Sequence, residues 1–204
     1  MSEKYRFDTM SLHSGHVPDK ETGSRAVPIY QTTSYVFKDT DEAAALYNME
    51  VGGHLYTRIS NPTIATLEQR LASLDGGVSC IACSSGMAAM HLVVSAICSS
   101  GDHIVASNKM YGANINLLQH TMTRFGVKTD FVNPNDLEEI EKSIKPNTKL
   151  VFGEVIGNPG LDVMNVPEVA KICKKKNVPL AIDATFNTPY LMKPISHGAN
   201  IVIH

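Results

Sequence analysis

The chain has 204 residues, of which 43% are hydrophobic and 19% are charged, and its formal net charge is −2. This composition is ordinary for a globular protein and leaves no excess of basic residues for binding nucleic acid or an anionic membrane. No run approaches the ~18 consecutive apolar residues of a membrane helix, and the N-terminal MSEKYRFDTM lacks the apolar segment of a signal peptide. We therefore expect a cytoplasmic protein.

The first part of the chain differs from the rest. Residues 1–55 are rich in Gly, Pro, Ser and Thr, and only one short helix is expected there, near 41–47. Because such an arm has little core of its own, it must pack against the body of the protein or against a partner subunit. We therefore divide the chain into an N-terminal arm, residues 1–55, and a domain, residues 56–204.

From about residue 60, expected helices and strands alternate. Asn61 and Pro62 are typical of the N-cap and first residue of a helix, which we expect to end at Gly76. Further strands are expected at 78–83, 103–107, 128–132, 149–155, 180–183 and 200–204. Further helices are expected at 87–98, 112–126, 137–144 and 167–176. The alternation predicts an α/β fold with a mostly parallel sheet sandwiched by helices.

Two features that often mark binding sites have plainer explanations here. Cys80 and Cys83 form a C-x-x-C, but on an apolar strand residues three apart face opposite sides, and no second pair with ligand spacing follows. We therefore expect no metal site. The basic run 174–176 falls at the end of an expected helix, where cations complement the helix dipole.

In a parallel sheet, ligands bind at the carboxyl ends of the strands, near the N-termini of the helices that follow. Gly86 and Met87 open a helix at such a place, where unbonded N–H groups and a glycine suit an anion such as phosphate. Asp183 closes an apolar strand, where a carboxylate needs a cation, a metal or a donor as its partner. Taken alone, each feature is equally explained by an ordinary turn or capping residue.

Aromatic and basic side chains stand at two further candidate positions. Arg58, with Tyr56 beside it, precedes the first helix of the domain, and its guanidinium fork matches phosphate. A contact between the arm and the domain explains this pair as well. Tyr111 follows the strand at 103–107, where it can stack on a flat ring, transfer a proton or simply fill the core.

Taken together and in this order, the motifs resemble those of the Cys/Met-metabolism family of pyridoxal-phosphate enzymes, which have fold type I. The resemblance covers essentially the whole chain, through GSRAVPIYQTTSYVF, YTRISNPT, SSGMAA, MYGAN, GNP, and DATFNTPYL to HGANIVIH. It implies the large domain of a fold type I transferase preceded by an extended arm that contacts the partner subunit. It also implies a pyridoxal 5′-phosphate cofactor, an amino-acid substrate, and homodimers or homotetramers with shared sites.

The resemblance assigns the candidate residues to two parts of the cofactor. Gly86 and Met87 would give backbone N–H groups to the phosphate. Tyr56 and Arg58 would reach the phosphate of the neighbouring subunit.

The remaining residues would surround the ring. Tyr111 would stack on the pyridine ring and serve as a catalytic group that helps to transfer protons. Asp183 would pair with the pyridinium nitrogen and keep the ring an electron acceptor. Asn158 and Thr185 would lie near the phenolic oxygen of the ring and the substrate.

The chain departs from the family pattern in two places. Ala184 stands where the family usually has Asn, and its side chain should point away from the ring because it follows Asp183 on a strand. The sequence ends at His204, before the S-x-T-K segment that carries the Schiff-base lysine in such enzymes. We therefore expect that lysine and the C-terminal domain to be absent from this chain.

Within the family, Gly157 before Asn158, Asn116 in the tyrosine segment and the final HGANIVIH resemble the O-acetylhomoserine sulfhydrylases. Methionine γ-lyases tend to carry a cysteine where this chain has Ala113. The resemblance implies γ-replacement in methionine biosynthesis: O-acetyl-L-homoserine and sulfide or a thiol give homocysteine or methionine, and acetate.

Two alternatives stay open. Within the class they are methionine γ-lyase and cystathionine γ-synthase or γ-lyase activity. The alternative from a different class is that the chain is a non-catalytic fragment, which binds the cofactor or assembles with a missing half. An S-x-T-K segment in the next stretch of the reading frame would distinguish the enzyme from the fragment.

Overall fold

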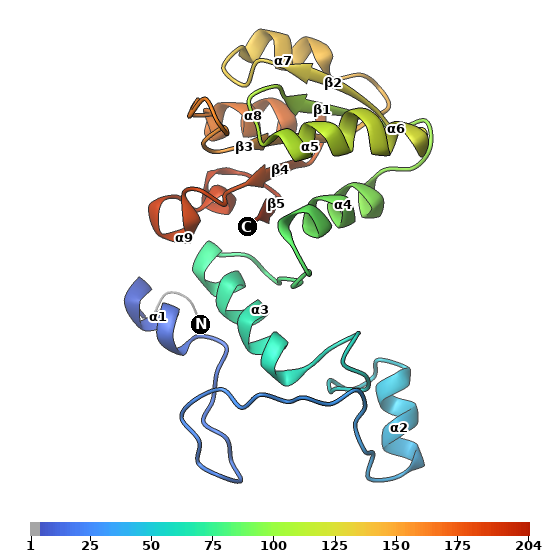
Figure 1. The fold of residues 1–204 in the computed structure, drawn as a ribbon, viewed down its shortest axis with the longest axis vertical. Coiled ribbons are helices and arrows are strands. Elements are labelled where there is room, and N and C mark those ends of the chain that lie inside the picture. The colour runs from blue at the N-terminus through green and yellow to red at the C-terminus, as the bar shows by residue number, and fades with distance from the viewer. Residues whose placement is uncertain (1–4) are drawn as a thin grey trace. The chain divides into compact units, whose positions relative to one another are not determined.

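The computed structural model describes residues 5–204, which divide between Ala82 and Cys83 into two units. Figure 1 draws the helices and strands of both units. The division falls at a different place from the predicted boundary between arm and domain at residue 56. The assignment of residues 56–82 to a cofactor-binding domain therefore stays a prediction.

Within residues 5–82, the N-terminal unit has three helices joined by extended chain (Figure 1), namely α1 (Phe7–His13), α2 (Thr40–Tyr47) and α3 (Pro62–Asp75). α3 begins and ends where the sequence predicts. The Asn61 side chain accepts a hydrogen bond from the Thr63 N–H at 2.9 Å, and Gly76 ends the helix with φ at +78°. α1 was not expected from the sequence. It packs against α3, where the Arg70 Nε donates to the Ser14 carbonyl at 2.9 Å.

The arm is held to the start of α3 mainly by polar contacts. The Thr63 hydroxyl donates to the Pro28 carbonyl at 2.8 Å, and the Asn61 Nδ2 donates to the Tyr30 carbonyl at 2.9 Å. Ser34 and Tyr56 form an antiparallel bridge. In the described part of this unit, the buried hydrophobic side chains are those of Met10 and Leu74. The expectation that the arm has little core of its own is therefore confirmed.

The C-terminal unit is built on a parallel sheet. Its strands are β1 (His103–Ser107), β2 (Lys128–Val132), β3 (Thr148–Glu154), β4 (Leu180–Asp183) and β5 (Ile201–Ile203), in the order β2-β1-β3-β4-β5. The predicted α/β class is confirmed. β2 and β3 lie on opposite sides of β1, so the direction of winding reverses between β1 and β3. A crevice is expected at the carboxyl ends of strands at such a point.

Helices cover both faces of this sheet (Figure 1). One face carries α4 (Gly86–Ile97), α5 (Gly112–Asn116), the π-helical turn η2 (Leu117–Thr121) and α6 (Met122–Arg124); the other carries α7 (Leu137–Ser143) and α8 (Val166–Lys176). Two short elements, α9 (Thr188–Leu191) and the 3-10 turn η3 (Pro194–His197), were not expected. Within residues 5–204, no helix combines the length and apolar character that a membrane span requires.

The core has two layers because side chains alternate across each strand. Ile104 and Phe152 belong to the layer under α4 and α5, whereas Val105 and Val151 belong to the layer under α7 and α8. Ala184 is fully buried in the second layer, so its side chain points away from the first, as predicted.

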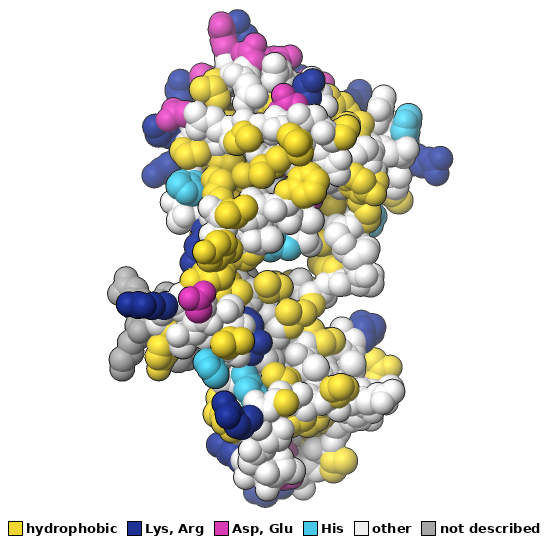
Figure 2. Space-filling view, turned by 60° about the vertical axis from the view of Figure 1, so that its left-hand side comes forward, with side chains coloured by type: hydrophobic (Ala, Val, Ile, Leu, Met, Phe, Trp, Pro, Cys, Tyr) yellow, Lys and Arg dark blue, Asp and Glu magenta, His cyan; other side chains and the backbone are white. Residues whose placement is uncertain are grey.

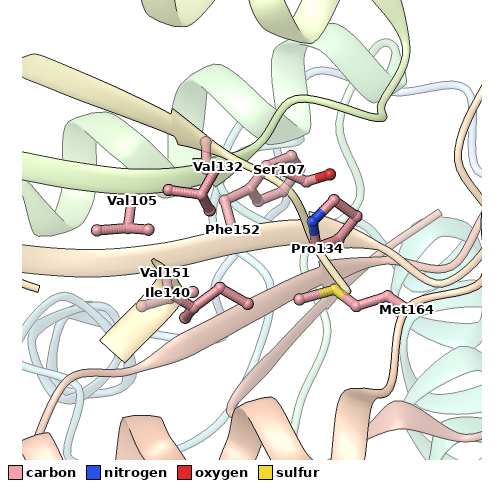
Figure 3. Close-up of a pocket in the computed structure, with 9 residues that line it drawn as sticks. Val105, Ser107, Val132, Pro134, Ile140, Val151, Phe152 and Met164 are labelled. Atoms are coloured by element: carbon pink, nitrogen blue, oxygen red, sulfur yellow. The ribbon is translucent and has the colours of Figure 1, made fainter. Parts of the chain in front are cut away.

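A hollow between β1, β2 and β3 lies within this packing rather than at a ligand site. Figure 3 shows its lining side chains, which include Val132, Ile140 and Met164. The space among them leaves no room for a water molecule. It therefore belongs to the hydrophobic core.

The prediction of a strand at 78–83 is wrong. These residues have no regular secondary structure, Val78 and Ile81 are exposed, and no strand in the described part of the chain pairs with them. Apolar and β-branched residues favour a strand only where a neighbouring strand accepts and donates the backbone hydrogen bonds. The pattern of this segment contains no information about such a neighbour.

The basic run 174–176 lies in the last turn of α8, as predicted. The Lys175 Nζ is 2.8 Å from the Glu141 Oε1, and the Lys176 Nζ is 3.6 Å from the same atom. These lysines therefore join α8 to α7 as well as complementing the helix dipole.

A buried histidine at the amino end of β1 links this strand to β2 and β3. The His103 side chain is 2% exposed, and its Nδ1 lies 2.8 Å from the Thr148 Oγ1. Its Nε2 lies 3.3 Å from the Asp130 Oδ2, which also contacts the Lys145 Nζ at 2.5 Å. Burial lowers the pKa of His103, and the nearby Lys145 charge lowers it further, against the opposing effect of Asp130.

This network predicts a stability that depends on pH. Because folding lowers the pKa of His103, the unfolded chain takes up the proton first as the pH falls below the ordinary value of 6.5. The free energy of unfolding should therefore decrease from about pH 6.5 downwards, until the pH passes the lower folded pKa. Urea unfolding curves above and below pH 6.5 measure this decrease.

The variants H103Q and H91Q provide the test and its control. H103Q cannot titrate, so it should flatten the decrease, whereas H91Q changes an exposed histidine and should keep it. An equal pH dependence in H103Q and the unsubstituted protein would contradict the assignment.

Candidate functional site

The start of α4 offers two backbone donors. The Ser85 hydroxyl caps this helix by accepting the Ala88 N–H at 3.1 Å. In the described part of the chain, no acceptor takes the N–H groups of Gly86 and Met87. Gly86 is exposed, and a Cβ at this position would meet only the His204 carbonyl oxygen, 4.0 Å away. Open N–H groups at the positive end of a helix dipole suit an anion.

Two carboxylates end neighbouring strands. Glu154 ends β3 and Asp183 ends β4, and the two are register partners. Their side chains therefore share one face of the sheet, opposite to that of Ala184 and beneath α4 and α5. The Asp183 side chain is half-buried, and its Oδ1 accepts the Thr185 N–H at 2.9 Å.

Glu154 is buried and was missed by the sequence analysis. It is 6% exposed, and its Oε1 accepts the Tyr111 N–H at 2.7 Å, while its Oε2 accepts the Asn158 N–H at 3.2 Å. Burial raises the pKa of Glu154, and the neighbouring charge of Asp183 raises it further, against the hydrogen bonds it accepts. A signal was present, because Glu154 is a single acid among apolar residues near the end of the expected strand at 149–155.

The other candidate residues of this unit lie on loops at the same sheet edge. Tyr111 is the N-cap residue of α5 and is 49% exposed, so its ring is available to a ligand. Asn158 lies in the loop after β3 and is half-buried, and Thr185 lies after β4 and is exposed. An open groove of about 400 Å³ lies between Met87 and one side of α5 and η2, from Gly112 to Thr121. The binding roles of these residues stay predictions.

The loop after Asp183 is fixed by a side chain that the sequence analysis did not identify. Asn187 is 2% exposed, and its Nδ2 donates to the carbonyls of Thr188 and Met192, each at 3.0 Å. Thr188 has φ at +54°, a conformation that residues with a Cβ rarely adopt. These contacts hold the chain between Asn187 and Met192 in place.

Tyr56 and Arg58 belong to the N-terminal unit. The Arg58 guanidinium carbon lies 5.8 Å from the centre of the Tyr56 ring, within reach of a cation–π contact, and both side chains are exposed. Thr57 between them donates its N–H to the Thr33 carbonyl at 2.8 Å. The predicted contact of this pair with a phosphate concerns a neighbouring subunit and stays a prediction.

Comparisons with known proteins bear on both units. Residues 8–204 match the family model described as Cys/Met metabolism PLP-dependent enzyme. The chain is 46% identical over 204 residues to an O-acetyl-L-homoserine sulfhydrylase of Leptospira meyeri, covering 100% of this chain and 46% of that protein. It is 37% identical to an L-methionine gamma-lyase of Treponema denticola, over 99% of this chain and 51% of that protein. The chain thus spans about half the length of these relatives.

A crystal structure shows the same fold. A Campylobacter jejuni protein assigned as an O-acetylhomoserine (thiol)-lyase matches with a TM-score of 0.94 and 38% identity, over 97% of this chain and 49% of that chain. It carries N′-pyridoxyl-lysine-5′-monophosphate at its position 205. Together, the fold type I architecture, the motifs and these relatives show that the chain belongs to the Cys/Met-metabolism family of pyridoxal-phosphate-dependent enzymes.

Proposed function

We propose that this chain supplies the cofactor-binding part of an enzyme that replaces the γ-substituent of O-acetyl-L-homoserine. Sulfide or a thiol is the second substrate, and the products are homocysteine or methionine, and acetate. One observation carries the proposal: the open N–H donors of Gly86 and Met87 and the carboxylate of Asp183 belong to the same face of one sheet. Greater identity to the sulfhydrylase than to the γ-lyase, 46% against 37%, favours replacement over elimination.

The donor set of this edge fits pyridoxal 5′-phosphate. Gly86 and Met87 would hold the phosphate, and the Asp183 carboxylate would hold a proton on the ring nitrogen. The exposed Tyr111 ring would lie against the cofactor ring. When bound, the cofactor supplies a positively charged ring that stores the electrons released at substrate carbons.

The remaining residues act on the substrate side. Asn158 and Thr185 would orient the substrate and the phenolic oxygen of the ring. The Tyr111 hydroxyl would hold or move a proton beside the substrate. We place the Schiff-base lysine and the C-terminal domain beyond His204, which agrees with the modified lysine of the Campylobacter jejuni protein.

We further propose that the sites are shared within a homodimer or homotetramer, with the arm against the partner and Tyr56 and Arg58 at the partner's phosphate. Apolar side chains lie on the surface of the N-terminal unit (Figure 2), and Val36 and Met49 are 99% and 89% exposed. Burying such side chains is what an interface provides. The four cysteines, all within the described residues, form no disulfide bond, in keeping with a cytoplasmic enzyme.

Product analysis tests the proposed reaction. A polypeptide that continues from this chain through an S-x-T-K segment, incubated with O-acetyl-L-homoserine and sulfide, should form homocysteine and acetate in equal amounts. Formation of ammonia and a 2-oxo acid would instead support γ-elimination. Residues 1–204 alone should bind the cofactor weakly and form no homocysteine. A stoichiometric lysine adduct of that shorter chain after borohydride reduction, together with homocysteine formation, would place the catalytic lysine inside it.

Replacement of Asp183 tests the electronic role of that carboxylate. In the active polypeptide, D183N should keep part of the cofactor and lose most turnover, because an amide cannot stabilise a protonated ring nitrogen. A hydrogen bond to a charged group contributes ~1.5–3 kcal/mol, so kcat/KM should fall about tenfold to a hundredfold. D136N is the matched control, because Asn caps α7 as well as Asp does. Near-normal turnover in D183N would remove Asp183 from the site.

Subunit mixing tests whether Arg58 acts across an interface. Subunits with R58A, mixed with subunits that lack the Schiff-base lysine, should recover part of the activity, because each mixed dimer regains one intact site. The control pairs D183N with the same lysine variant and should recover none, since Asp183 would act within its own subunit. If no mixture with R58A exceeds its parents, the assignment across the interface is wrong.

A further inference from the structure

The loops after β1 and β3 meet where the winding of the sheet reverses, and a buried carboxylate bridges them. Glu154 accepts the backbone N–H of Tyr111, in the first loop, and that of Asn158, in the second. The donors bind different carboxylate oxygens, Oε1 at 2.7 Å and Oε2 at 3.2 Å. The Asn114 side chain adds a longer contact to Oε1, at 3.4 Å. Glu154 thus joins two residues that flank the proposed cofactor site.

A glycine lets the same two loops touch. A Cβ at Gly157 would come within 2.2 Å of the Lys109 carbonyl oxygen, so the backbones are too close for any other residue. Lys109 is itself fixed, because its N–H donates to the Ser107 hydroxyl at 3.0 Å. The carboxylate bridge and this backbone contact therefore hold the loops at one separation.

The loop after β3, which carries Asn158, is closed on itself by two backbone hydrogen bonds. The Gly157 N–H donates to the Asp162 carbonyl, and the Leu161 N–H donates to the Gly157 carbonyl, both at 2.8 Å. Leu161 holds φ at +59°, which only a constrained loop imposes on such a residue. Anchoring Asn158 at Glu154 consequently anchors the whole loop.

A carboxylate is the side chain that this bridge requires. The two N–H groups approach the two different oxygens of the Glu154 carboxylate. A carboxylate accepts at both atoms, whereas an amide accepts at its oxygen and donates from its nitrogen. Burying the charge beside Asp183 is unfavourable. The residue type is therefore explained by its pair of backbone donors rather than by burial or by its neighbour.

We propose that Glu154 is a positioning residue whose carboxylate sets the separation and orientation of Tyr111 and Asn158 at the cofactor site. The inference rests on the proposed function for the identity of that site. The bridge itself can be measured without cofactor or turnover.

Site-resolved amide hydrogen exchange of the cofactor-free protein tests the bridge. In E154A, the N–H groups of Tyr111 and Asn158 should both exchange about tenfold faster or more, as expected for the loss of a bond to a charged acceptor. In E154Q, exchange of one of these two N–H groups should accelerate far more than exchange of the other, because the glutamine amide has only one acceptor atom. The Phe152 N–H, in the centre of β3, should be unchanged in both variants.

T148V is the matched control. Thr148 lies at the opposite end of β3 and bonds His103, so its loss removes a buried polar contact away from this edge. It should leave the exchange at Tyr111 and Asn158 unchanged. If E154A accelerates exchange equally across the sheet, or leaves both amides as in the unsubstituted protein, Glu154 does not position the loops.

Kinetics of the active polypeptide then separate positioning from general stability. E154Q should lower kcat by about tenfold or more while the cofactor affinity changes little, because the phosphate donors of Gly86 and Met87 lie elsewhere. Equal values of kcat in E154Q and the unsubstituted enzyme would overturn the positioning role. A failure of homocysteine formation in the unsubstituted enzyme would overturn the proposed function and leave the exchange result intact.

Discussion

The parallel pairing of β1, β3 and β4 is the constraint on which the candidate site depends. Parallel strands end at the same edge, so residues far apart in the sequence become neighbours there, and the register sets Glu154 beside Asp183. Because β2 and β3 lie on opposite sides of β1, the loops that follow β1 and β3 open a crevice between them. The alternation of side chains then directs both carboxylates to the face that carries α4 and α5.

This edge separates charges in a way that suits a ligand with two unlike ends. The start of α4 presents N–H donors and the positive end of a dipole, which favours an anionic group. The ends of β3 and β4 present carboxylates, of which Glu154 is buried and fully used by backbone donors, while Asp183 keeps an exposed part. Asp183 is therefore the acid available to a cationic ligand, and Glu154 holds the loops around it.

The sequence predicted most elements of the C-terminal unit because their limits are encoded locally. The strands at 103–107, 128–132 and 180–183 were predicted to the residue, and the helix expected at 137–144 is α7. The strand at 78–83 failed because strand formation depends on a partner that the segment itself does not specify. Gly86 and Asp183 stand in motifs that can be recognised in the sequence. The role of Glu154 instead depends on its hydrogen bond with the backbone of Tyr111, which is 43 positions away in the sequence.

If the start of α4 and the end of β4 hold the two ends of one cofactor, amide chemical shifts should report both contacts in a single titration. Residues 1–204, labelled with ¹⁵N, would be titrated with pyridoxal phosphate and with pyridoxal, which lacks the phosphate. Pyridoxal phosphate should shift the N–H signals of Gly86 and Met87 together with signals around Asp183, whereas pyridoxal should leave the Gly86 and Met87 signals unmoved. Unchanged Gly86 and Met87 signals, with the largest shifts at the basic end of α8, would contradict this placement of the cofactor.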